Sequence, residues 1–381
     1  MKKRVLHVVT VSFVINHFFG KQFLYLNHKN GNEYFLACSP SDEFKELSET
    51  LSYIPISLNM TRTIDPLMDL FAIFKLFCYI KKYKIDVVVG HTPKGGMIAM
   101  IASFFAGVEN RIYFRHGIFY ETSFGVKKLL LKSIDRLTGS LAVKVVCVSN
   151  DVKCKSEIDK LNDTKKNIIL GRGTCNGVDT KKRFNKQNIS VDLIEELRCK
   201  YFILEDDIVI GYVGRIVKDK GIEDLIEAWR IIITKYKNVK LLLVGPFEDK
   251  DSVSSKCKKI IEEEESIIYT GFVSDSENYF ALMDIFILPT YREGFPTVTL
   301  EASSMQIPVI SSKATGCKES LIENVTGIFC ENDANDIAKK MEYYIINPVE
   351  RKQAGIDGRK FVSKNFDHSI IWELLNSKLG I

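Results

Sequence analysis

The sequence predicts an α/β protein made of two doubly wound, parallel-sheet domains, and three observations support this. At 381 residues the chain exceeds the length at which single hydrophobic cores stop growing. Short apolar segments alternate with longer amphipathic ones in both halves, as in parallel sheets with helical crossovers. This alternation is interrupted once, between Asp179 and Glu205, by polar and charged sequence. We therefore predict an N-terminal domain over residues 1–180 and a C-terminal domain over residues 181–365.

In the first half, short β-branched or apolar runs predict the strands. These strands are Val5 to Val9, Tyr34 to Cys38, Ile54 to Leu58, Asp86 to Val89, Arg111 to Phe114, Val143 to Cys147 and Ile168 to Leu170. The expected helices include Gly20 to Lys29, a helix opened by Asp65-Pro66 that runs to about Lys84, and Met97 to Phe105. Asp65 is a favourable N-cap and Pro66 suits the first helical turn.

In the second half, the polar stretch is interpreted as the linker and first helix of the C-terminal domain. The expected strands are Ile208 to Val213, Lys240 to Val244, Ile267 to Thr270, Ile285 to Leu288, Pro308 to Ser311 and Gly327 to Cys330, with helices between them.

The segment that follows the strand ending at Pro289 carries the strongest functional pattern, YREGFPTVTLEASS. Pro296 is expected at the first position of a helix, so the amides of Thr297 and Val298 would point out of its N-terminus, which favours anions. Glu293 lies ahead of these amides and Glu301 lies about one turn inside the helix. Since carboxylates pair with hydroxyls rather than with phosphate, the pattern indicates a nucleotide-sugar, which has sugar rings on both sides of its phosphates.

A second loop supplies two cations, Arg215 and Lys220, between a strand end and the next helix. Both could converge on a diphosphate, Arg bidentately and Lys as a point charge; the alternative is a pair of ordinary surface cations. Because two cations can neutralise a leaving diphosphate, no metal and no other cofactor is expected.

Histidines follow strands of the N-terminal domain. His116, with Gly117 behind it, comes just after a strand, and the alternative to a functional role is a buried structural histidine. His91 and Lys94 follow another strand and are candidates for the acceptor side, with His17 a weaker one.

The segment EGFPTVTLE, from Glu293 to Glu301, resembles the paired-glutamate motif of the family 4 retaining glycosyltransferases. The resemblance covers most of the chain through GYVGRIVKDKG, LLLVGPFED, YTGFVSD, TGCKESLIENVTG and NGVD. It implies the GT-B architecture, in which two Rossmann-like domains face each other across a cleft. It also implies that the last helix, about 366–381 here, crosses back onto the N-terminal domain.

The same resemblance implies roles for the site residues. Glu293 would hold hydroxyls of the donor sugar, Glu301 the ribose, and His116 the sugar near its anomeric carbon. Arg215 and Lys220 would hold the diphosphate. The loop after the strand ending at Thr270 would meet the nucleobase. The remaining substrate-binding positions within the matching motifs are Gly214, Gly271, Phe272, Val273, Gly294, Phe295, Thr297 and Val298.

The predicted function is therefore a retaining glycosyltransferase that uses a nucleotide-sugar, with UDP as the expected nucleotide. Resemblance to enzymes of capsule, O-antigen and exopolysaccharide synthesis implies a polyprenyl-diphosphate-linked (undecaprenyl) glycan acceptor. A soluble acceptor and a UDP-sugar 2-epimerase of the same fold are the enzymatic alternatives. A basic, non-catalytic protein that binds nucleic acid or membranes is the alternative of another class; it leaves Glu293 and Glu301 unexplained, so no nucleic-acid partner is expected.

We predict a cytoplasmic protein on the inner face of a membrane. The nine cysteines are odd in number and form no C-x-x-C pair, which indicates a reducing compartment. No segment has the eighteen or so uninterrupted apolar residues of a spanning helix. Residues 1–180 carry 25 Lys and Arg against 16 Asp and Glu, whereas residues 181–381 carry 28 against 32. On a helix over Ser123 to Leu137, Lys128, Lys132 and Arg136 would share one face, which favours docking on an anionic membrane surface. An ordinary crossover helix has a similar pattern.

Overall fold

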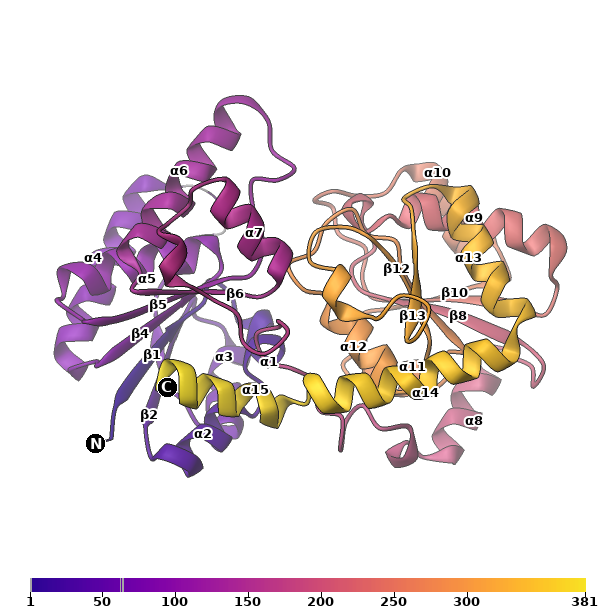
Figure 1. Cartoon of the computed structure of the whole chain (residues 1–381), viewed down its shortest axis with the longest axis horizontal. Coiled ribbons are helices and arrows are strands. Elements are labelled where there is room, and N and C mark those ends of the chain that lie inside the picture. Colours follow the sequence, from indigo (N-terminus) through magenta and orange to yellow (C-terminus); the bar gives the residue numbers. More distant parts are fainter. Residues whose placement is uncertain (1, 62, 64) are drawn as a thin grey trace. The chain divides into compact units, whose positions relative to one another are not determined.

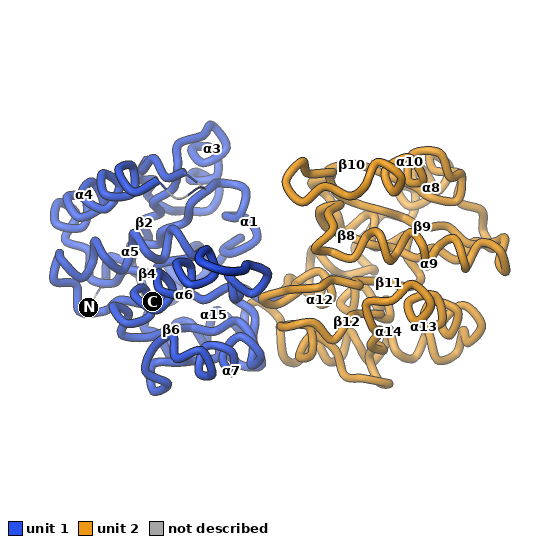
Figure 2. The backbone as a smooth tube through the Cα atoms, turned by 90° about the horizontal axis from the view of Figure 1, so that it is seen from above, with its two compact units in different colours: residues 1–177, 369–381 blue, residues 178–368 orange. Residues whose placement is uncertain are grey.

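The chain folds into two compact units (Figure 2). The computed structural model describes residues 2–61, 63 and 65–381. Unit 1 comprises residues 1–177 and 369–381, and unit 2 comprises residues 178–368. The last residues of the chain therefore belong to the unit in which the chain begins.

Unit 1 is built on a parallel sheet with the strand order β3-β2-β1-β4-β5-β6-β7. The strands are β1 (Arg4–Val8), β2 (Glu33–Cys38), β3 (Ile54–Ser57), β4 (Val87–His91), β5 (Asn110–Arg115), β6 (Lys144–Cys147) and β7 (Asn167–Ile168). Every neighbouring pair is parallel. The strand order reverses between β1 and β4, which makes this the doubly wound sheet that the sequence predicts.

Helices cover both faces of this sheet (Figure 1). The helices are α1 (Ile15–Phe18), α2 (Gln22–Asn30), α3 (Asp42–Leu51), α4 (Pro66–Tyr83), α5 (Pro93–Phe105), α6 (Gly125–Leu141), α7 (Asn150–Ile158) and α15 (His368–Leu374). Leu375–Leu379 continue α15 as a π-helical turn. Helices α4, α5 and α6 lie on one face, and α2 and α15 lie on the other.

Local capping explains where two of these helices begin. The predicted start of α4 is confirmed, since the Asp65 side chain accepts from the amide of Met68 at 3.2 Å. Helix α5 begins at Pro93 and not at the expected Met97, because the Thr92 hydroxyl caps the helix by accepting from the Gly95 amide at 3.3 Å. Strand β4 is therefore followed by a one-residue connection.

Unit 2 has a parallel sheet with the strand order β10-β9-β8-β11-β12-β13. Its strands are β8 (Ile208–Val213), β9 (Val239–Val244), β10 (Ile267–Gly271), β11 (Ile285–Leu288), β12 (Val309–Ser312) and β13 (Gly327–Cys330). Its helices are α8 (Val191–Lys200), α9 (Ile222–Lys235), α10 (Ser255–Glu263), α11 (Ser276–Phe280), α12 (Thr297–Ser304), α13 (Ala334–Ile346) and α14 (Pro348–Asn365). Short 3-10 turns occur at Ser12–Val14, Thr164–Lys166, Lys186–Asn188, Lys218–Lys220 and Lys318–Ser320.

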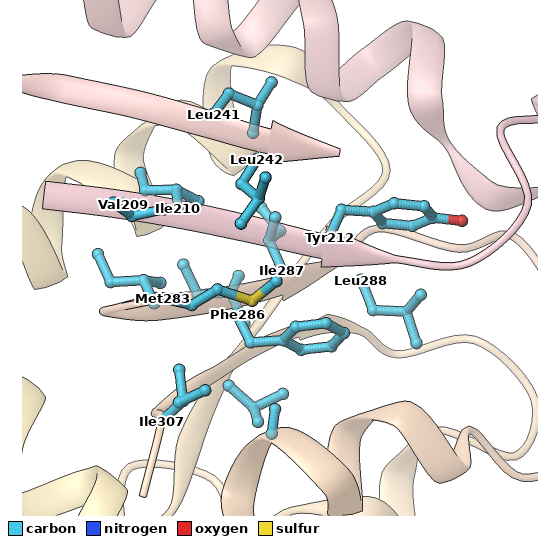
Figure 3. Packing of buried hydrophobic residues seen from close by; sticks show 14 of the residues in the cluster. Val209, Ile210, Tyr212, Leu241, Leu242, Met283, Phe286, Ile287, Leu288 and Ile307 are labelled. Atoms are coloured by element: carbon cyan, nitrogen blue, oxygen red, sulfur yellow. The ribbon is translucent and has the colours of Figure 1, made fainter. Parts of the chain in front are cut away.

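The buried strands β8, β9 and β11 lie in the core of unit 2 (Figure 3), where helices of the unit also contribute side chains. Leu241 and Phe286 are fully buried among their neighbours. Gly211 in β8 leaves room for Met283, because a Cβ there would lie 2.1 Å from its sulfur. Strands packed on both sides are rigid supports for the loops at their carboxyl ends, where ligands of such sheets bind.

Candidate functional site

In unit 2 the loops that follow β8 and β11 are bound to each other. The Tyr291 amide donates to the Asp219 carbonyl at 2.9 Å, and the Arg292 guanidinium pairs with the Asp219 carboxylate at 2.8 Å. Gly221 adopts a φ of +70° and packs so closely that a Cβ would lie 1.9 Å from the Pro289 carbonyl oxygen. Only glycine fits this left-handed, crowded position. The two loops therefore form one surface at the point where the strand order of this sheet reverses, between β8 and β11.

On this surface the Lys220 ammonium forms an ion pair and a short hydrogen bond with the Glu293 carboxylate. Both side chains are largely buried, with 14% and 18% of their surface exposed. A partly desolvated pair is held more strongly than an exposed one. Two residues that the sequence assigns to one ligand are thus in direct contact with each other.

Arg215 lies on the same loop but has a different partner. Its guanidinium pairs with Glu248, on the loop after β9, at 2.8 Å, and its side chain is 47% exposed. The buried Tyr212 hydroxyl donates to the Arg215 carbonyl at 2.8 Å and fixes the loop backbone. Burial, and to a smaller extent the Glu293 carboxylate, raises the pKa of Tyr212 well above its ordinary value. The Tyr212 hydroxyl therefore stays neutral and can donate a hydrogen bond.

Helix α12 starts one residue later than the sequence predicts. Pro296 occupies the N-cap and Thr297 is the first helical residue, because the ψ of Pro296, 93°, is extended. The amides of Thr297 and Val298 still belong to the first turn, where helix N–H groups are without intrahelical partners. The preceding Gly294 contacts the turn at Gly316, where a Cβ would lie 2.2 Å from the Gly294 carbonyl oxygen. The backbone ahead of α12 is therefore held in place.

Glu301 lies inside α12 and is half-buried. Desolvation raises the pKa of its carboxyl to about 7, with a lowering contribution from Arg183 and a raising one from Glu277. Arg183 and Glu277 pair with each other at 2.8 Å. Among the residues that the structure describes, Glu301 has no ion-pair partner, so its carboxyl is available to accept hydrogen bonds from hydroxyl groups.

The loop after β10 exposes an aromatic ring. Gly271 has a φ of +71° and ends the strand at a β-bulge. Phe272 is 77% exposed, whereas Val273 packs against the core, as does Phe295. An exposed phenylalanine that follows a strand suits stacking on a planar ring.

In unit 1 the predicted His116 is brought together with two other histidines. His116 Nε2 lies 3.1 Å from His91 Nδ1, and His91 Nε2 lies 3.0 Å from His7 Nδ1. Phe18 stacks on the His116 ring with centroids 4.0 Å apart. Burial lowers the pKa of His116 to about 3, with a smaller contribution from His17. His116 is therefore an uncharged imidazole.

Of the three acceptor-side residues, the structure changes the interpretation of His91 and Lys94, whereas the role of His17 stays a prediction. His91 is only 3% exposed and both of its ring nitrogens face other histidines, so we revise its predicted contact with a substrate. Lys94 pairs with Asp69 of α4 at 2.7 Å and also donates to Thr61, so its charge is already compensated. His17 is exposed on α1.

Several residues that the sequence patterns do not identify hold the loops and histidines in position. Tyr212 and Arg292 hold the unit 2 loops, and Phe18 and His7 surround the unit 1 histidines. The sequence did contain one usable signal, because His7, His91 and His116 lie in or directly after three strands that the topology makes neighbours.

The described residues include neither a metal-binding cluster nor a membrane-spanning helix. Within residues 2–61, 63 and 65–381 no group of three or more His, Cys, Asp or Glu side chains is arranged to hold a metal ion. None of the helices described is long and apolar enough to cross a bilayer.

Comparison with known families gives matches in both units. The model of "Glycosyl transferases group 1" matches residues 194–361, and that of "Glycosyltransferase Family 4" matches residues 28–156. The chain is 34% identical over 376 residues to the capsular polysaccharide biosynthesis glycosyltransferase CapM of Staphylococcus aureus. The aligned region covers 98% of this chain and 96% of the relative.

A second relative and a solved structure extend the comparison. The UDP-Gal:alpha-D-GlcNAc-diphosphoundecaprenol alpha-1,3-galactosyltransferase of Escherichia coli is 25% identical over 293 residues, or 75% of this chain and 71% of the relative. The structure of Anabaena HepE in complex with UDP-glucose aligns with a TM-score of 0.82 and 19% identity over 99% of each chain. At that identity the structural match supports the fold alone.

Proposed function

We propose a specific reaction for this chain, which belongs to the family 4 glycosyltransferases and has their GT-B fold. It transfers a sugar, with retention of the anomeric configuration, from a UDP-sugar to an undecaprenyl-diphosphate-linked glycan. The product would be a lipid-linked glycan extended by one sugar, a precursor of a bacterial surface polysaccharide such as a capsule or O-antigen. The name of CapM supports the pathway. The names of the Escherichia coli galactosyltransferase and of the HepE complex support the acceptor and the nucleotide.

The observation that carries this proposal is the Lys220–Glu293 pair at the β8/β11 edge. Lys220 would turn to the diphosphate, Arg215 would join it, and Glu293 would be released to accept hydroxyls of the transferred sugar. Lys220 and Arg215 then stabilise the charge that develops on the departing diphosphate. We propose that no divalent metal is needed for this step.

The rest of the donor would follow the surface around the pair. Phosphate oxygens would face the amides of Thr297 and Val298 at the positive end of α12. Glu301 would accept the ribose hydroxyls, and the base would lie against the Gly271–Val273 loop. Each part of a UDP-sugar has a group of matching chemistry in unit 2.

His116 would face the sugar near its anomeric carbon. In a retaining transfer the acceptor hydroxyl arrives on the side from which the diphosphate leaves, so its proton can pass to the departing phosphate oxygen. His116 is neutral and has a strongly lowered pKa. We therefore assign it hydrogen bonding to the sugar and not proton abstraction.

A peripheral membrane position would bring the enzyme to its lipid-linked acceptor. Helix α4 exposes an apolar stripe at the helical spacing i, i+3, i+4, i+7, formed by Leu67, Leu70, Phe71 and Phe74, which are 82%, 65%, 58% and 63% exposed. The start of α6 exposes Val126 and Leu129 beside Lys127 and Lys128. Apolar side chains next to lysines suit an anionic bilayer surface, on the cytoplasmic side where nucleotide-sugars are available.

A binding and turnover screen tests the proposed function. The protein is mixed with a panel of nucleotide-sugars, and binding is followed by thermal shift and turnover by UDP release with and without a polyprenyl-diphosphate-linked saccharide. We expect stabilisation by one UDP-sugar and UDP release that depends on the acceptor. Epimerised UDP-N-acetylglucosamine formed without any acceptor would instead support the 2-epimerase alternative.

A further inference from the structure

Three histidines in unit 1 form a continuous chain of ring nitrogens. His7 belongs to β1, His91 ends β4 and His116 follows β5, and these strands are neighbours in the sheet (Figure 1). The successive nitrogen–nitrogen distances are 3.0 Å and 3.1 Å, within the range of a hydrogen bond. Each of these contacts requires a single hydrogen between its two nitrogens.

Aromatic rings enclose the chain. His7 packs against Phe19 and Phe23 with centroids 5.2 Å and 5.0 Å apart, and His91 stacks on Phe114 at 4.8 Å. Burial lowers the pKa of all three histidines, to about 3 for His7 and His116. Each ring is therefore neutral and carries one N–H.

With one N–H on each ring, only two arrangements satisfy both contacts. In the first, all three rings are protonated on Nδ1, so His7 donates to His91 and His91 donates to His116. In the second, all three are protonated on Nε2 and the donors run in the opposite direction. Any other distribution leaves His91 with two protons or with none.

The far end of the chain distinguishes the two arrangements. His7 Nε2 is buried and has no hydrogen-bond partner among the described residues. In the second arrangement this atom would carry a buried, unsatisfied N–H, and unpaired buried donors are rarer than unpaired acceptors. The surrounding aromatic faces are only weak acceptors. The first arrangement avoids this penalty, because His7 Nε2 then carries a lone pair and no hydrogen.

We propose that His7 and His91 are positioning residues that hold His116 as its Nδ1–H tautomer, so that His116 offers the substrate a hydrogen-bond donor and not a base. This inference rests on the proposed role of His116 at the donor sugar. Nε2 of His116 is occupied by the His91 hydrogen bond, so Nδ1 is the nitrogen left for a ligand. The Nδ1–H group of His116 would donate to a hydroxyl oxygen of the transferred sugar. The proton of the acceptor hydroxyl would be left to the departing phosphate oxygen.

Nitrogen-15 NMR of the full-length protein labelled at histidine tests the tautomer directly. The chain has six histidines, which can be assigned by single substitutions, and protonated and bare ring nitrogens resonate far apart. We expect His7, His91 and His116 each to carry hydrogen on Nδ1 in the protein without substrates. Hydrogen on Nε2 of His116 would overturn the proposal. This readout requires no enzymatic activity, so it remains informative even if the proposed transfer reaction is wrong.

A matched pair of variants tests whether the tautomer matters for turnover. His91→Asn keeps an amide donor near the position of Nδ1, whereas His91→Leu has a similar branched shape without a donor. We expect His91→Leu to lose roughly tenfold in kcat, the size of one uncharged hydrogen bond, with KM nearly unchanged. It should also mix the two tautomers of His116, and His91→Asn should restore most of the loss.

The exposed His28→Leu on α2 serves as the control and should match the wild type. Melting curves show which variants are folded. Equal kcat for folded His91→Asn and His91→Leu would contradict the positioning role, as would a His116 tautomer that is unchanged in His91→Leu. If His91→Leu does not fold, the NMR spectrum of the wild type decides the question.

Discussion

At the scale of single residues, the Lys220–Glu293 pair is the feature on which the account depends. In the protein without ligand these charges compensate each other in a partly buried position, which avoids leaving either one unpaired. A diphosphate would offer Lys220 a stronger partner, and the sugar hydroxyls would take its place at Glu293. Binding of the UDP-sugar would thus replace the contact between Lys220 and Glu293 with a contact from each of them to the ligand.

Substituting each member of the pair should have a different effect on nucleotide binding. Lys220→Ala should weaken UDP binding roughly ten- to a hundredfold, because a charged hydrogen bond is worth about 1.5–3 kcal/mol. Glu293→Gln should leave UDP affinity intact or increase it, since Lys220 is no longer engaged, and should lower kcat strongly. Isothermal titration with UDP and steady-state kinetics measure both effects. The exposed Lys218→Ala, on the same 3-10 turn, is the control; equal losses of UDP affinity in all three variants would refute these roles.

Glu301 should make UDP binding depend on pH. Its pKa is raised to about 7 in the protein without ligand, and ribose hydroxyls donate to the ionised form, so binding favours loss of the proton. UDP affinity should therefore rise with pH up to about 7 and level off above it. In Glu301→Gln this rise should disappear, leaving only the titration of the phosphates. A pH dependence that is identical in both proteins would remove Glu301 from the ribose site.

The two loop cations should make turnover independent of divalent metals. Lys220 and Arg215 can both face the departing diphosphate, so the charge that a metal would neutralise already has partners. We expect transfer to persist in excess EDTA and to fall in Arg215→Ala and Lys220→Ala. Activity that stops in the chelator and returns with magnesium or manganese would contradict this mechanism.

The sequence identifies these residue types but not their contacts. Glu293 and Lys220 could be located from the local motifs around them, because strand ends and turn residues are local signals. Their direct pairing depends on two loops that are 73 positions apart in the chain. His91 was assigned to the acceptor side because it lies at a strand end. Its burial could not be predicted, since it depends on which side chains pack above it, here Phe19 and Phe114.

At the scale of elements, most strands follow from short apolar runs, and the larger errors concern helices. Helix α3 was absent from our expectations, although Ser41 caps it by accepting from the Phe44 amide at 3.1 Å and Asp42 lies in its first turn. That capping pattern is readable in sequence. In contrast, the contacts of the cations on α6 cannot be predicted from the sequence. Lys132 and Arg136 contact Asp159, just after α7, through tertiary packing.

This packing determines which variant can test membrane docking. Charge reversal at Lys132 or Arg136 would disturb the fold, whereas Lys127 and Lys128 are exposed. Lys127→Glu with Lys128→Glu should weaken sedimentation with anionic vesicles roughly thirtyfold or more, since each cation near such a surface is worth about 1 kcal/mol. Phe71→Ser with Phe74→Ser on α4 should also weaken it, and high salt should act mainly through the lysines.

Leu204→Ser, at a 69% exposed position of unit 2, is the apolar control and should bind as the wild type does. Equal sedimentation with zwitterionic and anionic vesicles, or none with either, would exclude the docking proposal and favour a soluble acceptor.

At the scale of the whole molecule, the sequence predicts the fold class well because alternation of strands and helices is a local property. The two parallel sheets and their reversal points at β1/β4 and β8/β11 are those of a doubly wound fold. The charge asymmetry also belongs to this scale, with the basic excess in the half that forms most of unit 1. The identity of the sugar depends on side-chain packing around the site and could not be predicted from these patterns.

Analysis of the product shows whether the protein transfers a sugar with retention from a UDP-sugar to a lipid-linked glycan. The protein is incubated with the UDP-sugar selected by the binding screen and an undecaprenyl-diphosphate-linked saccharide, and the purified product is examined by proton NMR at the new anomeric centre. We predict a product extended by one sugar, formed together with one UDP, with the anomeric configuration of the donor. A product of inverted configuration would contradict the retaining mechanism, and UDP-sugar consumption without extension of the acceptor would contradict the proposed transfer itself.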